Sequence, residues 1–287
     1  MKKKTWMLAA LAVIALLFTG CSVQKQSSDS KTKESTASSK TAPKNTWETA
    51  QKSKTITIGL DDTFVPMGFR DKSGEIVGYD IDLAKAVFAE YGITPKFQPI
   101  DWSMKETELK NGTIDLIWNG YSKTPAREKD VLFSNDYMKN KQVVVTLKDK
   151  NINNDQEMKD KIIGAQNGSS GYDAFNNQPK KLKDLVKDKD AVLYDTFDEA
   201  FLDLKAGRID GLLIDRVYAN YYLSHEDDLS KYTIFDSGFK SEDFAVGMRK
   251  QDKELDAKIN DAFKKLKEDG KMKEISQKWF GEDVTAD

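Results

Sequence analysis

After residue 54, apolar residues recur with either the period of a strand or that of a helix, and the two periodicities alternate along the chain. Alternating or β-branched runs predict strands at residues 55–60, 95–100 and 114–118. Between these runs, apolar residues recur at helical spacing from Leu83 to Tyr91, and a shorter helix is predicted at residues 104–110. Because strands and helices alternate, we expect a parallel sheet with helices on both faces.

The same alternation begins again after a strand predicted at residues 142–146, which indicates a second α/β unit. The pattern there predicts strands at residues 162–165, 192–194 and 211–214, with helices at 197–205 and 217–223. A last strand is expected at residues 243–248, followed by two amphipathic helices between residues 253 and 280. Ligands of open α/β sheets bind at the carboxyl ends of strands, so the polar turns there are candidate sites.

The first 20 residues have the pattern of an export signal. Lysines at positions 2–4 precede an apolar run at residues 6–18. As a helix this run is about 20 Å long, which is too short for a bilayer core of ~30 Å. We therefore expect a signal peptide, and no permanent membrane span, at residues 1–20.

Cys21 is the only cysteine of the chain and directly follows Leu17-Phe18-Thr19-Gly20. This stretch resembles the lipobox of bacterial lipoproteins, in which the cysteine is lipidated and becomes the first mature residue; Phe18 stands where leucine is commoner. The alternative is a stray cysteine in an ordinary signal peptide. A single cysteine leaves the body without a disulfide, a thiolate nucleophile or a cysteine metal site.

Residues 21–53 are rich in Ser, Thr, Lys and Gln, and Trp47 is almost their only large apolar side chain. Such a segment buries too little surface to fold, so we expect a disordered tether with a reach of about 30 Å. Residues 1–53 hold nine Lys and three Asp or Glu, a charge of +6, so with −2 for the whole chain the remainder carries −8. An acidic body argues against nucleic acid as a partner.

The sequence holds no recognisable catalytic or metal-binding pattern. His225 is the single histidine and lies in a polar stretch, so we expect it at the surface. No zinc pattern, glycine-rich phosphate loop or nucleophile elbow occurs. Adjacent carboxylates such as Asp61 and Asp62 point apart in an extended segment. We expect no cofactor and no metal, and binding in place of catalysis.

One stretch joins a strand end, a turn and a helix start: Trp118-Asn119-Gly120-Tyr121-Ser122-Lys123-Thr124-Pro125-Ala126-Arg127. Its Thr-Pro step is typical of a helix N-terminus. Backbone N–H groups near Ser122 and the Arg127 guanidinium could converge on a carboxylate or a phosphate. On this segment alone, an ordinary connection with a solvated arginine is the alternative.

Six short motifs occur in order between residues 55 and 281: Phe64-Val65-Pro66, Gly78-Tyr79-Asp80-Ile81-Asp82-Leu83, Asn111-Gly112-Thr113-Ile114-Asp115, Thr124-Pro125-Ala126-Arg127, Gly207-Arg208-Ile209-Asp210 and Lys278-Trp279-Phe280-Gly281. With them the chain resembles the solute-binding proteins of ABC importers for polar amino acids. The resemblance implies an α/β, two-lobed, type II periplasmic-binding-protein-like Venus-flytrap, each lobe a mostly parallel sheet flanked by helices. It implies lobe 1 at residues 54–146 and 242–287, lobe 2 at 147–241, and hinge crossings near 145 and 240.

In lobe 1 the resemblance assigns the ligand α-carboxylate to Arg127, with Ser122 as hydroxyl and N–H donor. The Gly120 carbonyl would face the α-ammonium group. The other residues that this comparison places around the ligand in lobe 1 are Asp61, Phe64, Trp102 and Asn119.

In lobe 2 the resemblance implies that Ser169 and Ser170, at a helix start, donate to the carboxylate, and that Asp215 holds the ammonium group. The sequence departs from the glutamine-binding pattern at Gln166, where that pattern has a lysine, and at Ile214, where it has a histidine. A zwitterion taken out of water needs both charges paired, so a ligand bridging Arg127 and Asp215 would favour closure of the lobes.

The function that the resemblance implies is an extracellular, lipid-anchored receptor that delivers a polar amino acid to an ABC permease, without a catalytic step. Glutamine, cystine, histidine and a basic amino acid remain open as ligands: Asp61, Asp62, Glu242 and Asp243 favour a cation, whereas Trp102, Trp118 and Gln166 suit a long polar side chain. We expect a monomer on the outer face of a Gram-positive cell membrane. The alternatives are a cyclohexadienyl-dehydratase-like enzyme on the same fold, and a sensor or adhesin that binds a protein.

Overall fold

The computed structural model describes residues 45–225 and 227–286. The signal peptide expected at residues 1–20, the lipidation site Cys21 and most of the expected tether lie outside the described residues. Within the described parts of the chain, no helix is both long enough and apolar enough to span a bilayer.

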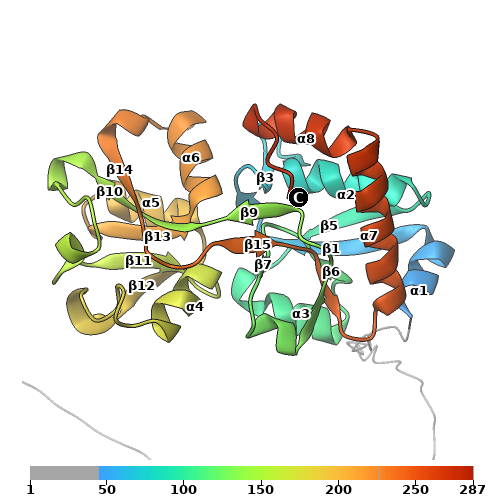
Figure 1. Ribbon diagram of the computed structural model, residues 1–287, viewed down its shortest axis with the longest axis horizontal. Helices are drawn as coiled ribbons and strands as arrows, with labels where there is room; N and C mark the ends of the chain where they lie inside the picture. Colours follow the sequence, from blue (N-terminus) through green and yellow to red (C-terminus); the bar gives the residue numbers. More distant parts are fainter. Residues whose placement is uncertain (1–44, 226, 287) are drawn as a thin grey trace, which may run out of the picture. The chain divides into compact units, whose positions relative to one another are not determined.

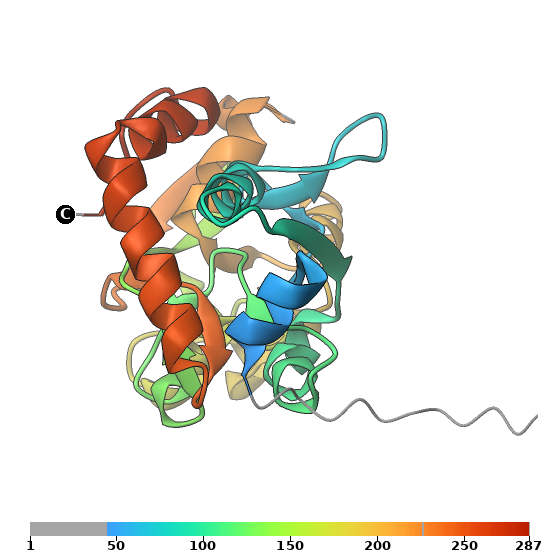
Figure 2. The ribbon, with the colours of Figure 1, turned by 90° about the vertical axis from the view of Figure 1, so that its right-hand side faces the viewer.

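Lobe 1 is built on a five-stranded sheet in the order β5-β1-β6-β16-β8. The β1 strand pairs in parallel with β5 and β6, whereas β16 pairs in antiparallel with β6 and β8. The strands are β1 (Thr55–Leu60), β5 (Thr94–Pro99), β6 (Leu116–Ile117), β8 (Val131–Phe133) and β16 (Gly247–Arg249). Figures 1 and 2 show the helices of this lobe around the sheet: α2 (Tyr79–Ala89), α3 (Lys105–Asn111), α7 (Lys253–Glu268) and α8 (Lys271–Phe280).

Lobe 2 is built on a second five-stranded sheet in the order β12-β11-β13-β10-β14. The β11 strand pairs in parallel with β12 and β13, whereas β10 pairs in antiparallel with β13 and β14. The strands are β10 (Gln142–Leu147), β11 (Ile163–Gln166), β12 (Ala191–Tyr194), β13 (Gly211–Asp215) and β14 (Tyr232–Asp236). The helices are α4 (Ser170–Asn177), α5 (Phe197–Lys205) and α6 (Arg216–His225).

Two three-stranded sheets complete the described body. One joins β7 (Ser122–Lys123), β15 (Glu242–Phe244) and β9 (Met138–Asn140). The other joins β2 (Thr63–Phe64), β3 (Gly68–Arg70) and β4 (Ile76–Val77). Short 3-10 helices are η1 (Trp102–Met104), η2 (Arg127–Lys129), η3 (Lys148–Lys150), η4 (Gln156–Met158), η5 (Lys187–Lys189) and η6 (Leu229–Lys231). The chain crosses between the lobes twice, from β9 to β10 and from β14 to β15 (Figure 1).

The α/β class predicted from the sequence is confirmed, and each large sheet is mostly parallel, with one of its five strands, β16 in lobe 1 and β10 in lobe 2, running opposite to the other four. The reason is the double crossing: β10 enters lobe 2, and β16 returns to lobe 1, in the direction opposite to the neighbouring strands. The whole of β10 belongs to the second sheet, so the first crossing lies close to Lys141 and not near 145. An apolar strand looks the same in sequence whichever sheet it joins.

The predicted tether is wrong at its end, because Thr46–Ser53 forms helix α1. Asn45 caps it by accepting a hydrogen bond from the Glu48 N–H. Trp47 is only 2% exposed and meets the edge of the Tyr91 ring at a centroid distance of 4.9 Å. The polar composition hid this helix, which is held by one buried aromatic side chain against lobe 1.

The amphipathic pattern predicted for the C-terminal helices is confirmed. On α7 the apolar positions Leu255, Ile259, Phe263 and Leu266 are all buried, and they belong to the core that α7 forms with α2. Figure 2 shows α7 running along one side of lobe 1. These helices support the strands from which the lobe 1 residues of the site extend.

Candidate ligand-binding site

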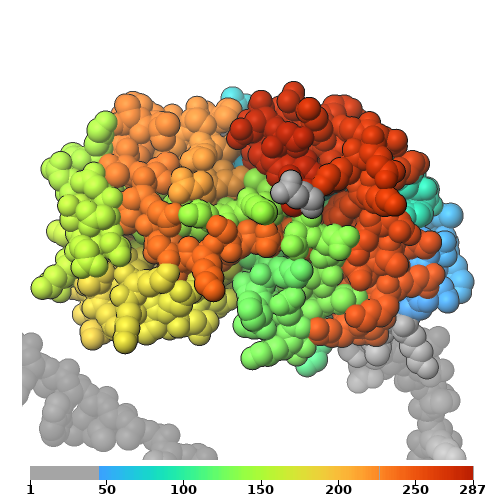
Figure 3. Space-filling model, viewed as in Figure 1, coloured from blue at the N-terminus to red at the C-terminus, as the bar shows by residue number. Residues whose placement is uncertain are grey.

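The structure brings all of the predicted site residues together around one cavity. From lobe 1 come Asp61, Phe64, Trp102, Asn119, Gly120, Ser122 and Arg127, and from lobe 2 come Gln166, Ser169, Ser170 and Asp215. The two lobes are in contact around it, and in Figure 3 atoms of lobe 2, in yellow and orange, lie against atoms of lobe 1, in green and red. The cavity is therefore lined by residues of both lobes.

The Gly120 turn forms one wall of the cavity. Gly120 has φ +55°, and its N–H donates to Asp80 Oδ2 at 2.7 Å. The same oxygen accepts from the Tyr137 hydroxyl at 3.0 Å. Burial raises the pKa of Asp80 to about 7, although both hydrogen bonds act in the opposite direction. Asp80 was quoted above only as part of a family motif; the structure shows that it holds this turn in place.

Replacing Gly120 by alanine is expected to weaken ligand binding about tenfold or more, because a Cβ there would lie 2.8 Å from Phe64 Cε1 and 3.3 Å from the Phe244 ring. Calorimetric titration checks this. Gly74→Ala is the matched control, since Gly74 also has positive φ, +87°, but has open space around it. Both variants should lose ~1–3 kcal/mol of stability from the left-handed backbone. Equal affinity of the two variants would contradict this role of the turn.

Arg127 lies at the start of η2 and is 8% exposed. Its Nη1 donates to the Ser122 carbonyl at 2.9 Å and its Nη2 to the Gly168 carbonyl of lobe 2 at 3.0 Å. The guanidinium stacks over the Tyr121 ring at 4.6 Å. The helix predicted after Pro125 is a single 3-10 turn, yet it still places this cation at the cavity.

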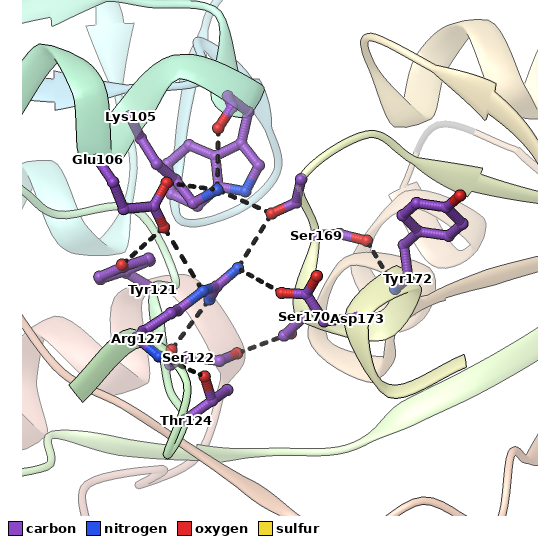
Figure 4. Close-up of polar contacts among 12 residues, drawn as sticks. Lys105, Glu106, Tyr121, Ser122, Thr124, Arg127, Ser169, Ser170, Tyr172 and Asp173 are labelled. Carbon is purple, nitrogen blue, oxygen red and sulfur yellow. Dashed lines mark hydrogen bonds and ion pairs between the residues drawn. The ribbon is translucent and has the colours of Figure 1, made fainter. Parts of the chain in front are cut away.

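Figure 4 shows the Arg127 guanidinium between two carboxylates, one from each lobe. Glu106 lies 3.7 Å from Nε and Asp173 lies 3.9 Å from Nη2. These are longer than hydrogen bonds, so the guanidinium keeps capacity for a carboxylate that reaches it from the cavity.

The loop before α4 supplies the lobe 2 side of this anion site. Ser169 caps α4, and its hydroxyl oxygen accepts from the Tyr172 N–H at 3.1 Å. Ser170 is the first residue of α4 and is 6% exposed. A helix N-terminus beside a buried guanidinium favours a bound anion.

Asp215 ends β13, lines the same cavity and is 5% exposed. Its Oδ1 accepts from Asn140 Nδ2 at 2.6 Å and from Gln142 Nε2 at 2.8 Å. Burial and, after it, the charge of Glu242 raise the pKa of Asp215 to about 7. A cation placed beside this carboxylate would offset its buried charge.

A third part of the cavity is lined by Asp61, Gln166 and aromatic rings. Gln166 Nε2 donates across the lobes to Asp61 Oδ2 at 2.7 Å, and Asn119 Oδ1 accepts from the Asp61 N–H at 3.2 Å. Burial raises the pKa of Asp61. Phe64 packs against two rings of lobe 2, with centroid distances of 5.9 Å to Phe197 and 5.5 Å to Tyr218.

Several residues of the site were not singled out from the sequence. Lys105 Nζ donates to the Gly168 carbonyl at 2.8 Å, and burial, with the nearby charge of Arg127, lowers its pKa to about 8. Asn140 and Gln142 hold Asp215. A lysine in a charged segment and two amides beside a hinge carry no sequence signal, because only the fold brings them to the cavity.

Some residues named as possible specificity determinants lie away from the cavity. Asp62 pairs with Arg70 at 2.5 Å outside it. Trp118 is fully buried in lobe 1, where its ring meets Phe263 at 5.7 Å. His225 is exposed, as predicted. In the described residues no cluster of His, Cys, Asp and Glu could hold a metal ion.

Three comparisons with known proteins agree with this fold. A family model for bacterial extracellular solute-binding proteins, family 3, matches residues 56–282. ABC transporter arginine-binding protein 1 of Escherichia coli (strain K12) is 31% identical over 233 residues, covering 80% of this chain and 93% of that protein. A crystal structure of an ABC uptake transporter substrate-binding protein from Streptococcus pneumoniae with bound histidine is 58% identical, with a TM-score of 0.84, covering 85% of this chain and 99% of that one.

A further solved structure bears on the enzymatic alternative. The ancestral amino-acid-binding protein AncCDT-1, a precursor of cyclohexadienyl dehydratase, is 30% identical with a TM-score of 0.73, and the match covers 82% of this chain and 100% of that one.

The chain belongs to the bacterial extracellular solute-binding proteins, family 3. The resemblance read from its motifs is thereby confirmed, together with the fold class that this family implies.

Proposed function

We propose that this protein is the amino-acid receptor of an ABC importer, and that it takes up its ligand in the cavity between the lobes. The observation that carries the proposal is that Arg127 and Asp215, from different lobes, line the same cavity. A guanidinium from one lobe and a carboxylate from the other complement the carboxylate and ammonium groups of an α-amino acid. Similarity to transport proteins that bind arginine or histidine supports the same reading.

The ligand that we propose is a polar amino acid whose side chain carries, or can accept, a positive charge. Two buried carboxylates, Asp61 and Asp215, line the cavity, and Arg127 is the one cation among its lining residues in the described part of the chain. A positive group of the ligand beside these carboxylates would offset their buried charge. Histidine and arginine supply this group better than glutamine or cystine.

The setting that we propose for the receptor follows from its N-terminus. Export by the signal peptide at residues 1–20, lipidation of Cys21 and a tether that ends before α1 would hold a monomeric receptor at the outer face of a Gram-positive cell membrane. From there it would deliver its ligand to an ABC permease. The hinge crossings beside β10 and β15 would let lobe 1 and lobe 2 open and close.

The proposed function is tested by calorimetric titration of the protein with each common L-amino acid and with cystine. At least one cationic or imidazole-bearing amino acid is expected to bind, and to raise the melting temperature because it binds only the folded protein. The cyclohexadienyl-dehydratase alternative predicts turnover of a prephenate-like substrate, which its ultraviolet spectrum would reveal. Turnover, or no binding of any amino acid, would overturn the proposal.

A further inference from the structure

Glu242 is a carboxylate beside the cavity, hydrogen-bonded to two of its lining residues, that the amino-acid-binding scheme above leaves unused. It is the first residue of the hinge strand β15 and is half-buried. Its Oε2 accepts from the Ser122 hydroxyl of lobe 1 at 2.7 Å and from the Ser170 hydroxyl of lobe 2 at 2.8 Å. Gln142 Nε2 donates to the same oxygen at 3.1 Å. One carboxylate oxygen is thus the meeting point of three donors from both lobes.

The direction of these hydrogen bonds limits what the two serines can offer a ligand. A hydroxyl has one proton to donate and two lone pairs to accept with. When Ser122 and Ser170 donate their protons to Glu242, their oxygens remain only as acceptors. An acceptor suits the ligand's ammonium group and not its carboxylate, so in this arrangement the Ser122 and Ser170 hydroxyls do not take the donor role that the resemblance gave them. The carboxylate is left to Arg127 and to backbone N–H groups.

Glu242 also shares a donor with Asp215. The Gln142 side-chain nitrogen donates to Asp215 Oδ1 at 2.8 Å as well as to Glu242 Oε2, so both carboxylates lie against one amide. The negative charge of Glu242 disfavours ionisation of Asp215, and Arg127 acts in the opposite direction. The charge of Glu242 also raises the pKa of Asp173 on α4, although burial raises it more.

We propose that Glu242 is a positioning residue of the ammonium subsite, which orients the Ser122 and Ser170 hydroxyls as acceptors and adds a second negative charge beside Asp215. The inference rests on the proposed function, since it concerns how the same cavity recognises the amino group. It gives Glu242 a role in distinguishing amino acids from carboxylic acids of the same shape that lack the amine.

The test compares Glu242→Gln with the wild type by calorimetry, using an amino acid and its deaminated counterpart. The pairs are L-histidine with imidazole-4-propionate, or L-arginine with 5-guanidinopentanoate if arginine binds more tightly. Loss of one charge beside the ammonium group should weaken amino-acid binding about tenfold, or ~1.4 kcal/mol, and leave the deaminated compound unaffected or better bound. A merely structural role would weaken both compounds equally.

The pH dependence provides a second readout. Removing the Glu242 charge lets Asp215 ionise at lower pH, so the pH at which amino-acid affinity is half-maximal should move towards acid in Glu242→Gln. Asp236→Asn is the matched control, because Asp236 is an exposed carboxylate of β14 that pairs with Lys141 and does not line the cavity. It should change neither readout.

Ser122→Ala keeps the test decisive if Glu242→Gln folds poorly. If the Ser122 oxygen accepts from the ammonium group, this variant weakens binding of the amino acid but not of the deaminated compound. Weakening of both compounds to the same extent, in Ser122→Ala or in Glu242→Gln, would overturn the inference. Failure of the wild type to bind any amino acid would instead overturn the proposed function.

Discussion

Replacing Arg127 by alanine is expected to weaken amino-acid binding by at least about 100-fold, because the ligand's carboxylate would be buried without its charged partner. Removing one member of a buried, hydrogen-bonded charge pair typically costs 2–5 kcal/mol. Arg127 also donates to the Gly168 carbonyl of lobe 2, so the closed arrangement loses a contact in the same variant. Calorimetric titration measures the change directly.

Arg208→Ala is the control for this substitution. Arg208 is an exposed arginine of lobe 2 whose guanidinium pairs with Asp203 on the surface. Its loss should leave the affinity unchanged, since exposed ion pairs contribute little. If Arg127→Ala bound the amino acid as tightly as Arg208→Ala does, the guanidinium would not be the carboxylate partner.

Replacing Asp215 by asparagine should weaken binding by a similar factor and should also reduce its pH dependence. Burial raises the pKa of Asp215 to about 7, so the carboxylate is largely protonated at pH 6 and largely ionised at pH 8. The ammonium group needs the ionised form, so wild-type affinity for a ligand that does not itself titrate in this range, such as arginine, should rise about tenfold between these values. The rise should be smaller in Asp215→Asn, where other groups of the site such as Lys105, whose pKa burial lowers to about 8, still titrate.

The same substitution should weaken binding but should not lower the stability of the folded protein. Asp215 binds its proton more tightly when folded than when unfolded, so its ionisation destabilises the folded protein as the pH rises from about 4 through 7. Asp215→Asn should therefore be at least as stable as the wild type at pH 8, which separates lost binding from lost folding. Asp236→Asn, at an exposed carboxylate paired with Lys141, is the control. A pH-dependent affinity in Asp215→Asn equal to that of the wild type would rule out this role.

The site could be read from the sequence to the extent that its residues stand in local motifs. Arg127 follows a strand end and a Thr-Pro step, and Ser170 opens a helix after a small-residue loop; both patterns are local. The structure places both residues, with Asp215, at one cavity. The family match supports the fold that brings them there.

The rest depended on tertiary contacts that no local pattern encodes. The burial of Trp47 turned part of an expected tether into α1. The sequence named Glu242 only as one of four acidic residues that favour a cationic ligand, and the three donors to its carboxylate come from β7, β10 and α4. Such contacts join segments far apart in the sequence, so they can be identified only from the folded structure of both lobes.

The central claim is that opposite ends of one zwitterion are each held by a buried charge. Its most direct test compares the affinity of the wild-type protein for its best amino acid with that for the decarboxylated amine and for the deaminated acid; for histidine these are histamine and imidazole-4-propionate. Each analogue leaves one buried charge unpaired, so both should bind at least about 100-fold more weakly than the amino acid. Binding of either analogue as tightly as the amino acid would contradict the account.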